Sequence, residues 1–383
     1  MIARPSPLIK PPHCPNPDCR HYIRPDSSVW YQNAGTYRTI TFGTVPRFVC
    51  KSCGRSFSTQ TFSIDYFAKR RVNYQYVYNQ INACAGVRNI ARDLGLRDST
   101  ITNRIHRMAR NAILINQAIA DHLPAREDLV IDGLQNFCVS QYFPDNSTIV
   151  VGKSSQFAYD CDYATLRRCG RMTAQQKHRR KEIEKTYRAD PKAVKRSFQR
   201  LLRSIERRIP QRSVPLILYT DEKKDYLRAL WDRRKGIAQQ MFDGTIRHHM
   251  THSKEPRNQN NPLFAVNYFD REIRKDMASH ARETVQFPRN VCNAMLRLNL
   301  YMFDHNVRKP YRIRDRRLRE LSHAEAAGAD RDVLGRLVWG FFQRRVFRPP
   351  DLVLSESQQM TLNREWMTPL KKNPEVRWKY MSA

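Results

Sequence analysis

The chain has 383 residues, and its 68 Lys and Arg against 36 Asp and Glu give a formal net charge of +32. This length predicts two or three domains, and so large a positive charge favours nucleic acid as the neutralising partner. No apolar run is long enough to cross a membrane, and the first residues lack the apolar stretch of a signal peptide. We therefore expect a protein of the cell interior with no membrane partner.

The first 65 residues are typical of a zinc ribbon. Four of the nine cysteines form two close pairs, at Cys14/Cys19 and Cys50/Cys53. Four thiolates on two such turns hold Zn²⁺ tetrahedrally, and Gly54 lets the backbone bend so that amides point at sulfur. Alternating segments predict two short strands, at Tyr37–Phe42 and Arg47–Val49. The odd cysteine count argues against a disulfide scaffold.

Residues 66–125 carry helical periodicity and a helix-turn-helix pattern. The small Ala91 lets two helices approach, Gly95 supplies the turn, and Ile101 fills the shared core. Ser99 is the predicted N-cap of the second helix. That helix would expose four side chains suited to phosphates and base edges: Thr100, Asn103, Arg104 and Arg107. An ordinary helical hairpin with a glycine turn is the alternative.

Two apolar strands each run into an aspartate, at Leu129–Asp132 and at Leu216–Asp221. Strands of this kind belong in the middle of a sheet, so each carboxylate is expected at the rim of the sheet. Between them, residues 136–151 alternate around a predicted turn at 144–146, and a helix is expected after Asp221. A ribonuclease-H-like fold has this order of elements: a strand with an Asp, a hairpin, and a crossover to a second strand with an Asp.

Two such carboxylates can bind a pair of magnesium ions from one side, and a third acidic residue would complete the set. The best candidate is Glu283, within a helical pattern that extends through Met302. Three competitors are Glu255, Asp270 and Glu272. The last two are expected to pair with neighbouring arginines on a solvated helix face.

A basic segment at about residues 160–212 interrupts this region. Its dense positive charge, which includes Arg179, Arg180 and Lys181, predicts a DNA-binding arm, because like charges at this density need a neutralising partner. A solvated charged helix is the alternative. Apolar side chains at helical spacing predict an amphipathic helix in its second half: Phe198, Leu201, Leu202 and Ile205. Further on, the apolar run 333–342 is expected to pack on the preceding domain or on a second protomer.

With these motifs the chain resembles insertion-sequence transposases of the DDE type that carry an N-terminal zinc ribbon. The resemblance covers about residues 10–312 and departs mostly between 159 and 212. It rests on the ribbon, the helix-turn-helix, the two aspartate strands and the segment 261–311, which contains Arg282-Glu283-Thr284.

The resemblance implies that Asp132, Asp221 and Glu283 hold two Mg²⁺ or Mn²⁺ ions. Such an enzyme cleaves double-stranded DNA at the element ends, joins the freed 3′-hydroxyl to target DNA, and assembles as a homo-oligomer on DNA. A cytoplasmic, nucleoid-associated protein of a prokaryote is also implied.

The sequence thus predicts a multidomain α+β protein. We expect a zinc ribbon (1–65), a helix-turn-helix region (66–125), a ribonuclease-H-like α/β catalytic domain (126–310) with a basic helical insertion, and a C-terminal extension (311–383) of unknown role. Two other functions fit the same motifs. One is a non-catalytic DNA-binding regulator with a decayed nuclease fold, and the other is a nuclease that only hydrolyses.

Overall fold

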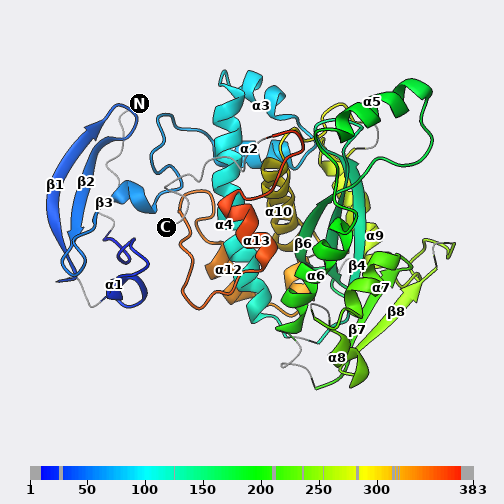
Figure 1. Cartoon of the computed structure of the whole chain (residues 1–383). Coiled ribbons are helices and arrows are strands. Elements are labelled where there is room, and N and C mark those ends of the chain that lie inside the picture. The colour runs from blue at the N-terminus through cyan, green and yellow to red at the C-terminus, as the bar shows by residue number, and fades with distance from the viewer. Residues whose placement is uncertain are drawn as a thin grey trace.

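The computed structural model describes residues 10–25, 29–124, 126–208, 213–234, 237–252, 254–281, 284–312, 315, 318 and 320–371. The fold is a mixed α+β structure with a five-stranded mixed sheet and, at the N-terminal end, a separate three-stranded sheet (Figure 1). Within these ranges, no helix combines the length and the apolar character needed to cross a membrane.

The N-terminal module has its own small core. Its elements are α1 (Arg20–Ile23), β1 (Tyr31–Thr39), β2 (Gly43–Cys50), β3 (Ser56–Ser58) and the 3₁₀ helix η2 (Thr59–Phe62). The strands pair antiparallel in chain order. Trp30 stacks on Phe57, with ring centroids 5.6 Å apart, next to the buried Cys14, Cys19 and Cys50. Both predicted strands are present, although residues 40–42 form the turn between them.

Three helices follow: α2 (Tyr74–Ile81), α3 (Val87–Asp93) and α4 (Asp98–His122). Gly95 turns the chain with φ +61°, and the amide of Leu96 donates to the carbonyl of Ala91. The predicted N-cap at Ser99 is wrong, because α4 already begins at Asp98, whose carboxylate accepts the Ser99 amide.

The helical region is not a separate unit. The buried side of α4 packs along α10 (Val291–Val307), in one hydrophobic core that also contains residues of the large sheet. Residues 66–125 and the sheet region therefore share a common core.

The large sheet has the strand order β6-β5-β4-β7-β8. Its strands are β4 (Leu129–Phe137), β5 (Pro144–Gly152), β6 (Ala158–Thr165), β7 (Leu216–Asp221) and β8 (Ile246–Thr251). Strands β4, β5 and β6 run antiparallel, whereas β7 lies parallel to β4 and β8 parallel to β7. The predicted hairpin is confirmed, but residues 138–143 form its turn and residues 144–146 already belong to β5.

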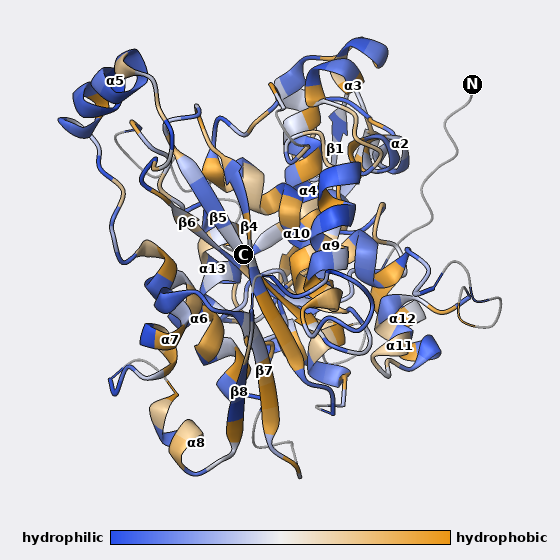
Figure 2. Cartoon of the chain, turned by 90° about the vertical axis from the view of Figure 1, so that its right-hand side faces the viewer, coloured by the Kyte–Doolittle hydropathy of each residue, from blue (hydrophilic) through white to orange (hydrophobic). Residues whose placement is uncertain are grey.

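Helices cover both faces of this sheet. Alternate residues of β4 enter two different cores: Leu129 and Ile131 join the core that contains α4, while Val130 and Leu134 join the core that contains α9 (Phe264–Asp276) and part of α10. Helices α6 (Ala193–Glu206) and α7 (Lys224–Leu230) supply further residues to the first core. In Figure 2, β7 is largely orange, as expected for a strand buried on both faces.

The basic segment divides into two parts. Residues 160–165 belong to β6, and the predicted amphipathic helix is α6, whose apolar side packs on β6 and α7. In contrast, α5 (Ala174–Glu184) has no buried residue and stands away from the sheet (Figure 2). The exposed part of the predicted arm is therefore α5 and its flanks.

The C-terminal region packs on the same chain. It contains α11 (His323–Ala326), α12 (Arg331–Val338) and α13 (Glu356–Asn363), and the short α8 (Ala238–Phe242) lies before β8. The ring of Phe341 stacks on that of Phe303 in α10, with centroids 4.6 Å apart. The apolar run 333–342 therefore reaches the common core. The amide of Arg345 donates to the carbonyl of Phe62, which ties this region to the N-terminal module.

Candidate metal and nucleic-acid sites

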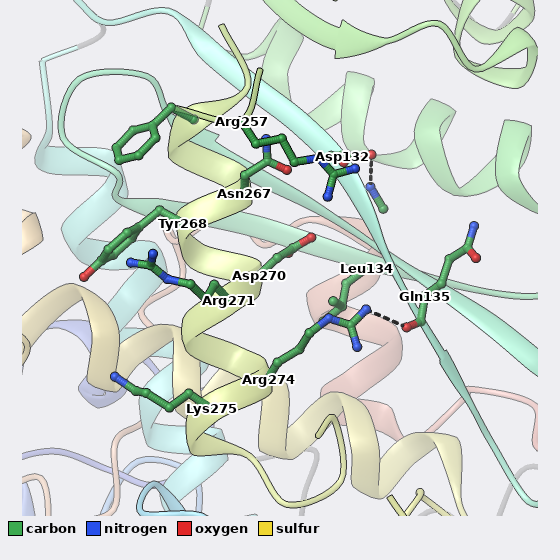
Figure 3. A pocket seen from close by; sticks show the side chains of 12 residues that line it. Asp132, Leu134, Gln135, Arg257, Asn267, Tyr268, Asp270, Arg271, Arg274 and Lys275 are labelled. Atoms are coloured by element: carbon green, nitrogen blue, oxygen red, sulfur yellow. Dashed lines mark hydrogen bonds between the residues drawn. The ribbon is translucent and has the colours of Figure 1, made fainter. Parts of the chain in front are cut away.

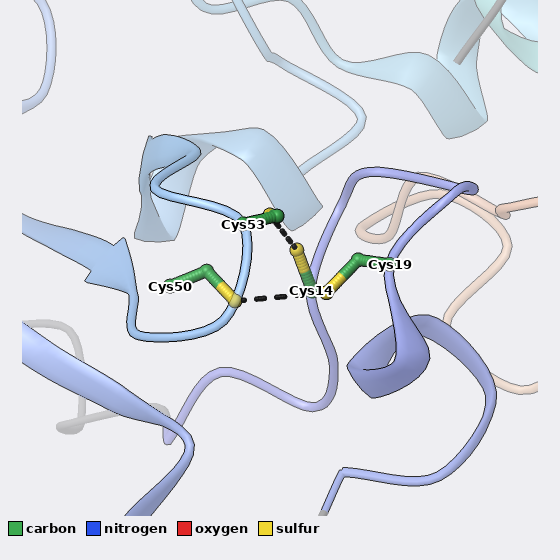
Figure 4. A group of neighbouring side chains, drawn as sticks. All are labelled: Cys14, Cys19, Cys50 and Cys53. Atoms are coloured by element: carbon green, nitrogen blue, oxygen red, sulfur yellow. Dashed lines mark hydrogen bonds between the residues drawn. The ribbon is translucent and has the colours of Figure 1, made fainter.

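The four predicted cysteines lie together. All four sulfur atoms are within 4.8 Å of one another (Figure 4). The Sγ atoms of Cys14 and Cys53 are 3.6 Å apart, and those of Cys19 and Cys50 are 3.7 Å apart. Four thiolates at ~2.3 Å from a tetrahedral Zn²⁺ would be about 3.8 Å from each other. The cluster thus fits a zinc-sized ion.

The backbone prepares the sulfur atoms for a cation. The amides of Asn16, His21 and Arg55 point at the sulfurs two residues before them, at Cys14, Cys19 and Cys53. Gly54, with φ +69°, allows this turn in the second pair. Burial raises the pKa of Cys14 and Cys19. At Cys53, hydrogen bonds from the Arg55 amide and from nearby side chains, first among them Asn16, outweigh burial and lower the pKa to about 7. Such amide donors stabilise a thiolate.

The two predicted aspartates lie on neighbouring strands. Leu129 and Val130 of β4 pair in parallel register with Leu218 and Tyr219 of β7, so two residues further on Asp132 lies beside Asp221. Val130 and Tyr219 both point to the core around α9, and alternation places both carboxylates on that face too. The prediction that Asp132 lies at the end of its strand is wrong. After β7 has ended at Asp221, β4 continues along β5 to Phe137.

The charge of Asp221 affects the neighbouring carboxyl group of Asp132. Burial and then the charge of Asp221 raise the pKa of Asp132 to about 6, against the opposing effects of the Gly133 amide, Lys223 and Arg257. Lys223 is held in place by a 3.0 Å hydrogen bond to the side chain of Asn146. A divalent cation between the two aspartates would remove this repulsion.

A cavity of about 720 Å³ opens beside Asp132, between β4 and α9 (Figure 3). Asp270 of α9 lines it, and one of its carboxylate oxygens, Oδ1, is buried without a hydrogen-bond partner. Burial and then the charge of Asp132 raise the pKa of Asp270 well above its ordinary value. The cavity also contains four cationic side chains: Arg257, Arg271, Arg274 and Lys275.

The predicted third carboxylate, Glu283, lies outside the described residues. The helical pattern expected to extend from it through Met302 is helical only from Val291, where α10 begins, because residues 284–290 belong to no helix. The expected solvated face for Asp270 and Glu272 is also wrong: Asp270 faces the cavity, and Glu272 is 8% exposed and pairs with Lys275 and Lys309.

From the sequence alone, Glu283 is a stronger candidate than Asp270. A helical pattern could have reversed that order. Asn267, Asp270, Arg271 and Arg274 follow the i, i+3, i+4, i+7 spacing of one helix face, and all four line the cavity. The third competitor, Glu255, is exposed.

The three aspartates fit a hard divalent cation chemically, because Mg²⁺ prefers carboxylate oxygens. They are less tightly grouped than the cysteines. Among the described residues, the cysteine cluster is the one group of at least three ligand side chains whose ligand atoms lie within 4.8 Å of one another. Metal binding at the aspartates would therefore require the side chains to move closer together.

The predicted DNA-contacting side chains differ in their exposure. Thr100, Asn103 and Arg107 are half-buried, and Arg104 is only 4% exposed, so the prediction that α4 exposes Arg104 is wrong. The reason is that residues 64–70 cover this side of α4 and accept hydrogen bonds from Arg104 and Arg107.

On α5, Arg179 and Lys181 are exposed as expected. Arg180 is partly engaged, because it donates to the carbonyl of Arg168 at 3.0 Å and lies 3.6 Å from Glu184. Two of the three arm residues are thus accessible to a partner.

No protein-family model matches the sequence, and no curated protein matches it significantly. The function has to be inferred from the geometry and charge of these sites.

Proposed function

We propose that the protein is a metal-dependent DNA nuclease and strand transferase of the DDE transposase type. It would cleave double-stranded DNA at element ends and join the freed 3′-hydroxyl to target DNA. The observation that carries the proposal is the side-by-side position of Asp132 and Asp221 on one face of the sheet, next to a basic cavity that also contains Asp270.

The sheet order supports the proposal. In chain order, three antiparallel strands are followed by two parallel ones, and Asp132 and Asp221 lie on the first and the fourth of these five strands. This order supports the proposed ribonuclease-H-like arrangement. The four-cysteine cluster and the pair α3–α4 would be its zinc ribbon and helix-turn-helix. Assembly as a homo-oligomer on DNA is part of the same proposal.

Asp132, Asp221 and Asp270 would hold Mg²⁺ or Mn²⁺. When bound, such ions lower the pKa of an attacking water or hydroxyl and neutralise charge on the phosphoryl oxygens. We assign the third position to Asp270, and Glu283 stays a competing prediction. Asp270 is the better candidate because its buried Oδ1 has no hydrogen-bond partner and its carboxylate lies near that of Asp132.

The cationic side chains of the cavity would position the substrate. Arg257 and Arg271 can bind the phosphodiester on either side of the scissile bond, since guanidinium groups pair with phosphate oxygens. Arg274 is oriented by its 3.1 Å hydrogen bond to the carbonyl of Gln135 on β4. In this scheme catalysis comes from positioning and charge neutralisation, without a covalent bond to the protein.

The test is Mg²⁺-dependent nicking of supercoiled plasmid and joining of labelled DNA ends by the full chain. Asp132→Asn and Asp221→Asn should each reduce both activities by about 10²–10³-fold, as expected for loss of a group that stabilises transition-state charge. DNA affinity should not fall. Glu222→Gln is the matched control, because Glu222 follows Asp221 and is exposed.

The products separate the three candidate functions. Joined products that depend on both aspartates support a transposase. Nicks without joined products would leave a hydrolytic nuclease, and DNA binding without either activity would favour a non-catalytic regulator.

A further inference from the structure

A second cavity, of about 850 Å³, lies where the start of α4 meets the segment 66–70. Six of the residues that line it are cationic: Lys69, Arg70, Arg97, Arg104, Arg107 and Arg110. None of the described lining residues is acidic. Positive charges that share a partly enclosed space repel one another, so an anion in this cavity would be stabilised.

The inner wall of this cavity is rigidly built. The Nη2 of Arg104 donates to the carbonyl of Arg70 at 2.8 Å, and the Nη1 of Arg107 donates to the carbonyl of Ile64 at 2.7 Å. The guanidinium of Arg107 also lies over the ring of Tyr66, 4.2 Å from its centroid. In addition, Nε of Arg104 is buried without a hydrogen-bond partner, on a side chain that is only 4% exposed.

The outer part of the cavity combines charge with an aromatic ring. Lys69, Arg70 and Arg97 are exposed. Phe67 is 73% exposed, at a backbone position with φ +54°. A phenylalanine so open to water contributes little to a hydrophobic core, but its ring face can stack on a planar ligand.

The N-terminal module supports this loop from the other side. Thr41, in the turn between β1 and β2, donates to the carbonyl of Lys69 at 2.7 Å. The guanidinium of Arg71 lies 5.2 Å from the ring centroid of Phe42 in the same turn. The loop is therefore held between two parts of the chain.

We propose that this cavity binds one unpaired nucleotide of a DNA strand, with its phosphate against the basic side chains and its base stacked on Phe67. The volume suits a ligand of this size, and single strands bind where basic grooves adjoin aromatic rings. A base inside a duplex is already stacked on both faces, so the nucleotide would be single-stranded or turned out of the helix. Arg104 and Arg107 then serve the cavity instead of a major groove.

This inference rests on the proposed function in one respect, namely that the ligand belongs to the DNA on which the protein acts. It adds a specific mode of binding. A nucleotide held here would fix the position of a DNA strand through contacts separate from the aspartate cavity.

The probe is a DNA trinucleotide with 2-aminopurine in the centre, titrated with the full chain in the absence of divalent metal. Binding should change the 2-aminopurine fluorescence, because stacking on a ring quenches it. Phe67→Ala should weaken binding by about 5- to 150-fold, the range expected for loss of one stacked base. Phe67→Trp should keep the affinity, and Arg97→Ala should lower it.

Arg92→Ala is the matched control, because Arg92 is an exposed arginine of α3 that does not line the cavity. Unchanged affinity in Phe67→Ala, or equal loss in Arg92→Ala and Arg97→Ala, would overturn the inference. The inference would also be overturned if inorganic phosphate displaced the trinucleotide equally well from wild type and from Phe67→Ala, because the base would then contribute nothing to the affinity.

The two proposals can fail separately. Asp132→Asn should bind the trinucleotide like wild type. Aspartate-dependent nicking together with normal binding by Phe67→Ala would reject the nucleotide cavity alone. Phe67-dependent binding without any nicking would reject the nuclease alone.

Discussion

The cysteine cluster and the aspartate cavity, for which we propose a metal site, differ in how closely their side chains are already grouped. In the cluster, sulfur pairs already lie 3.6 and 3.7 Å apart and three of the four sulfurs are met by backbone amides. In the cavity, Asp132 is fixed by β4, whereas Asp270 comes from a helix and leaves a buried oxygen unpaired. The first site is closed and the second is open.

This difference follows from what each site would do. A structural zinc site uses all its positions for protein ligands, whereas a catalytic site must leave positions for substrate and water. Thiols can remain protonated until zinc arrives, so they can be packed together in advance. Two neighbouring carboxylates repel each other near neutral pH, and they pack closely only when a cation is present.

Loss of the cluster should have the largest effect. Cys50→Ser should abolish binding of about one Zn²⁺ per chain and unfold the N-terminal module, because zinc supplies about 10–16 kcal/mol in small zinc domains. The core of the module contains only a few aromatic and cysteine side chains. Metal analysis and limited proteolysis would measure this, with new cleavage expected within residues 10–62.

Cys169→Ser is the control, since Cys169 is exposed and lies outside the cluster. It should keep both zinc and protease resistance. If Cys50→Ser also kept its zinc, the cluster would not be a structural zinc site.

The next effect separates the candidate third ligands. Asp270→Asn should lower Mg²⁺-dependent nicking by about 10²-fold and leave the fold intact. Glu272→Gln should instead lower the free energy of unfolding by about 1–3 kcal/mol, because Lys309 would lose one partner of a mostly buried ion cluster. Its activity per folded molecule should stay near wild type.

Plasmid nicking and urea denaturation of Asp270→Asn, Glu272→Gln and Glu283→Gln test this prediction. Normal nicking by Asp270→Asn, with loss in Glu283→Gln, would return the third position to Glu283.

Local patterns in the sequence predicted the parts of the structure that local chemistry determines. The cysteine pairs, the hairpin after Asp132 and the amphipathic helix α6 are each specified by residues a few positions apart. The adjacency of Asp132 and Asp221 could also be predicted, because the apolar runs that lead into the two aspartates favour the centre of one sheet.

Long-range packing could not be predicted from the sequence. That residues 64–70 cover Arg104, and that α4 is buried along α10, depends on contacts between distant segments. Residues 284–290, which were expected to be helical, contain Pro288 and lie outside α10. Proline removes an amide donor and disfavours helix at the residue before it.

The smallest effect tests the charge repulsion in the open site. The pKa of Asp132 is raised from 3.8 to about 6 in the folded protein, so its ionisation destabilises the metal-free fold as pH rises from 4 to 6. Asp132→Asn should therefore increase the free energy of unfolding by about 1–2 kcal/mol near neutral pH without divalent metal, after allowance for solvent screening. The gain should shrink as pH falls from 6 towards 4 and disappear only below about pH 3, where the carboxyl is protonated in both the folded and the unfolded state. Urea denaturation across this range measures it, and Mg²⁺ should stabilise wild type but not the variant. An equal gain at pH 4 and pH 7 would mean that the substitution improves packing and that the aspartates do not repel each other.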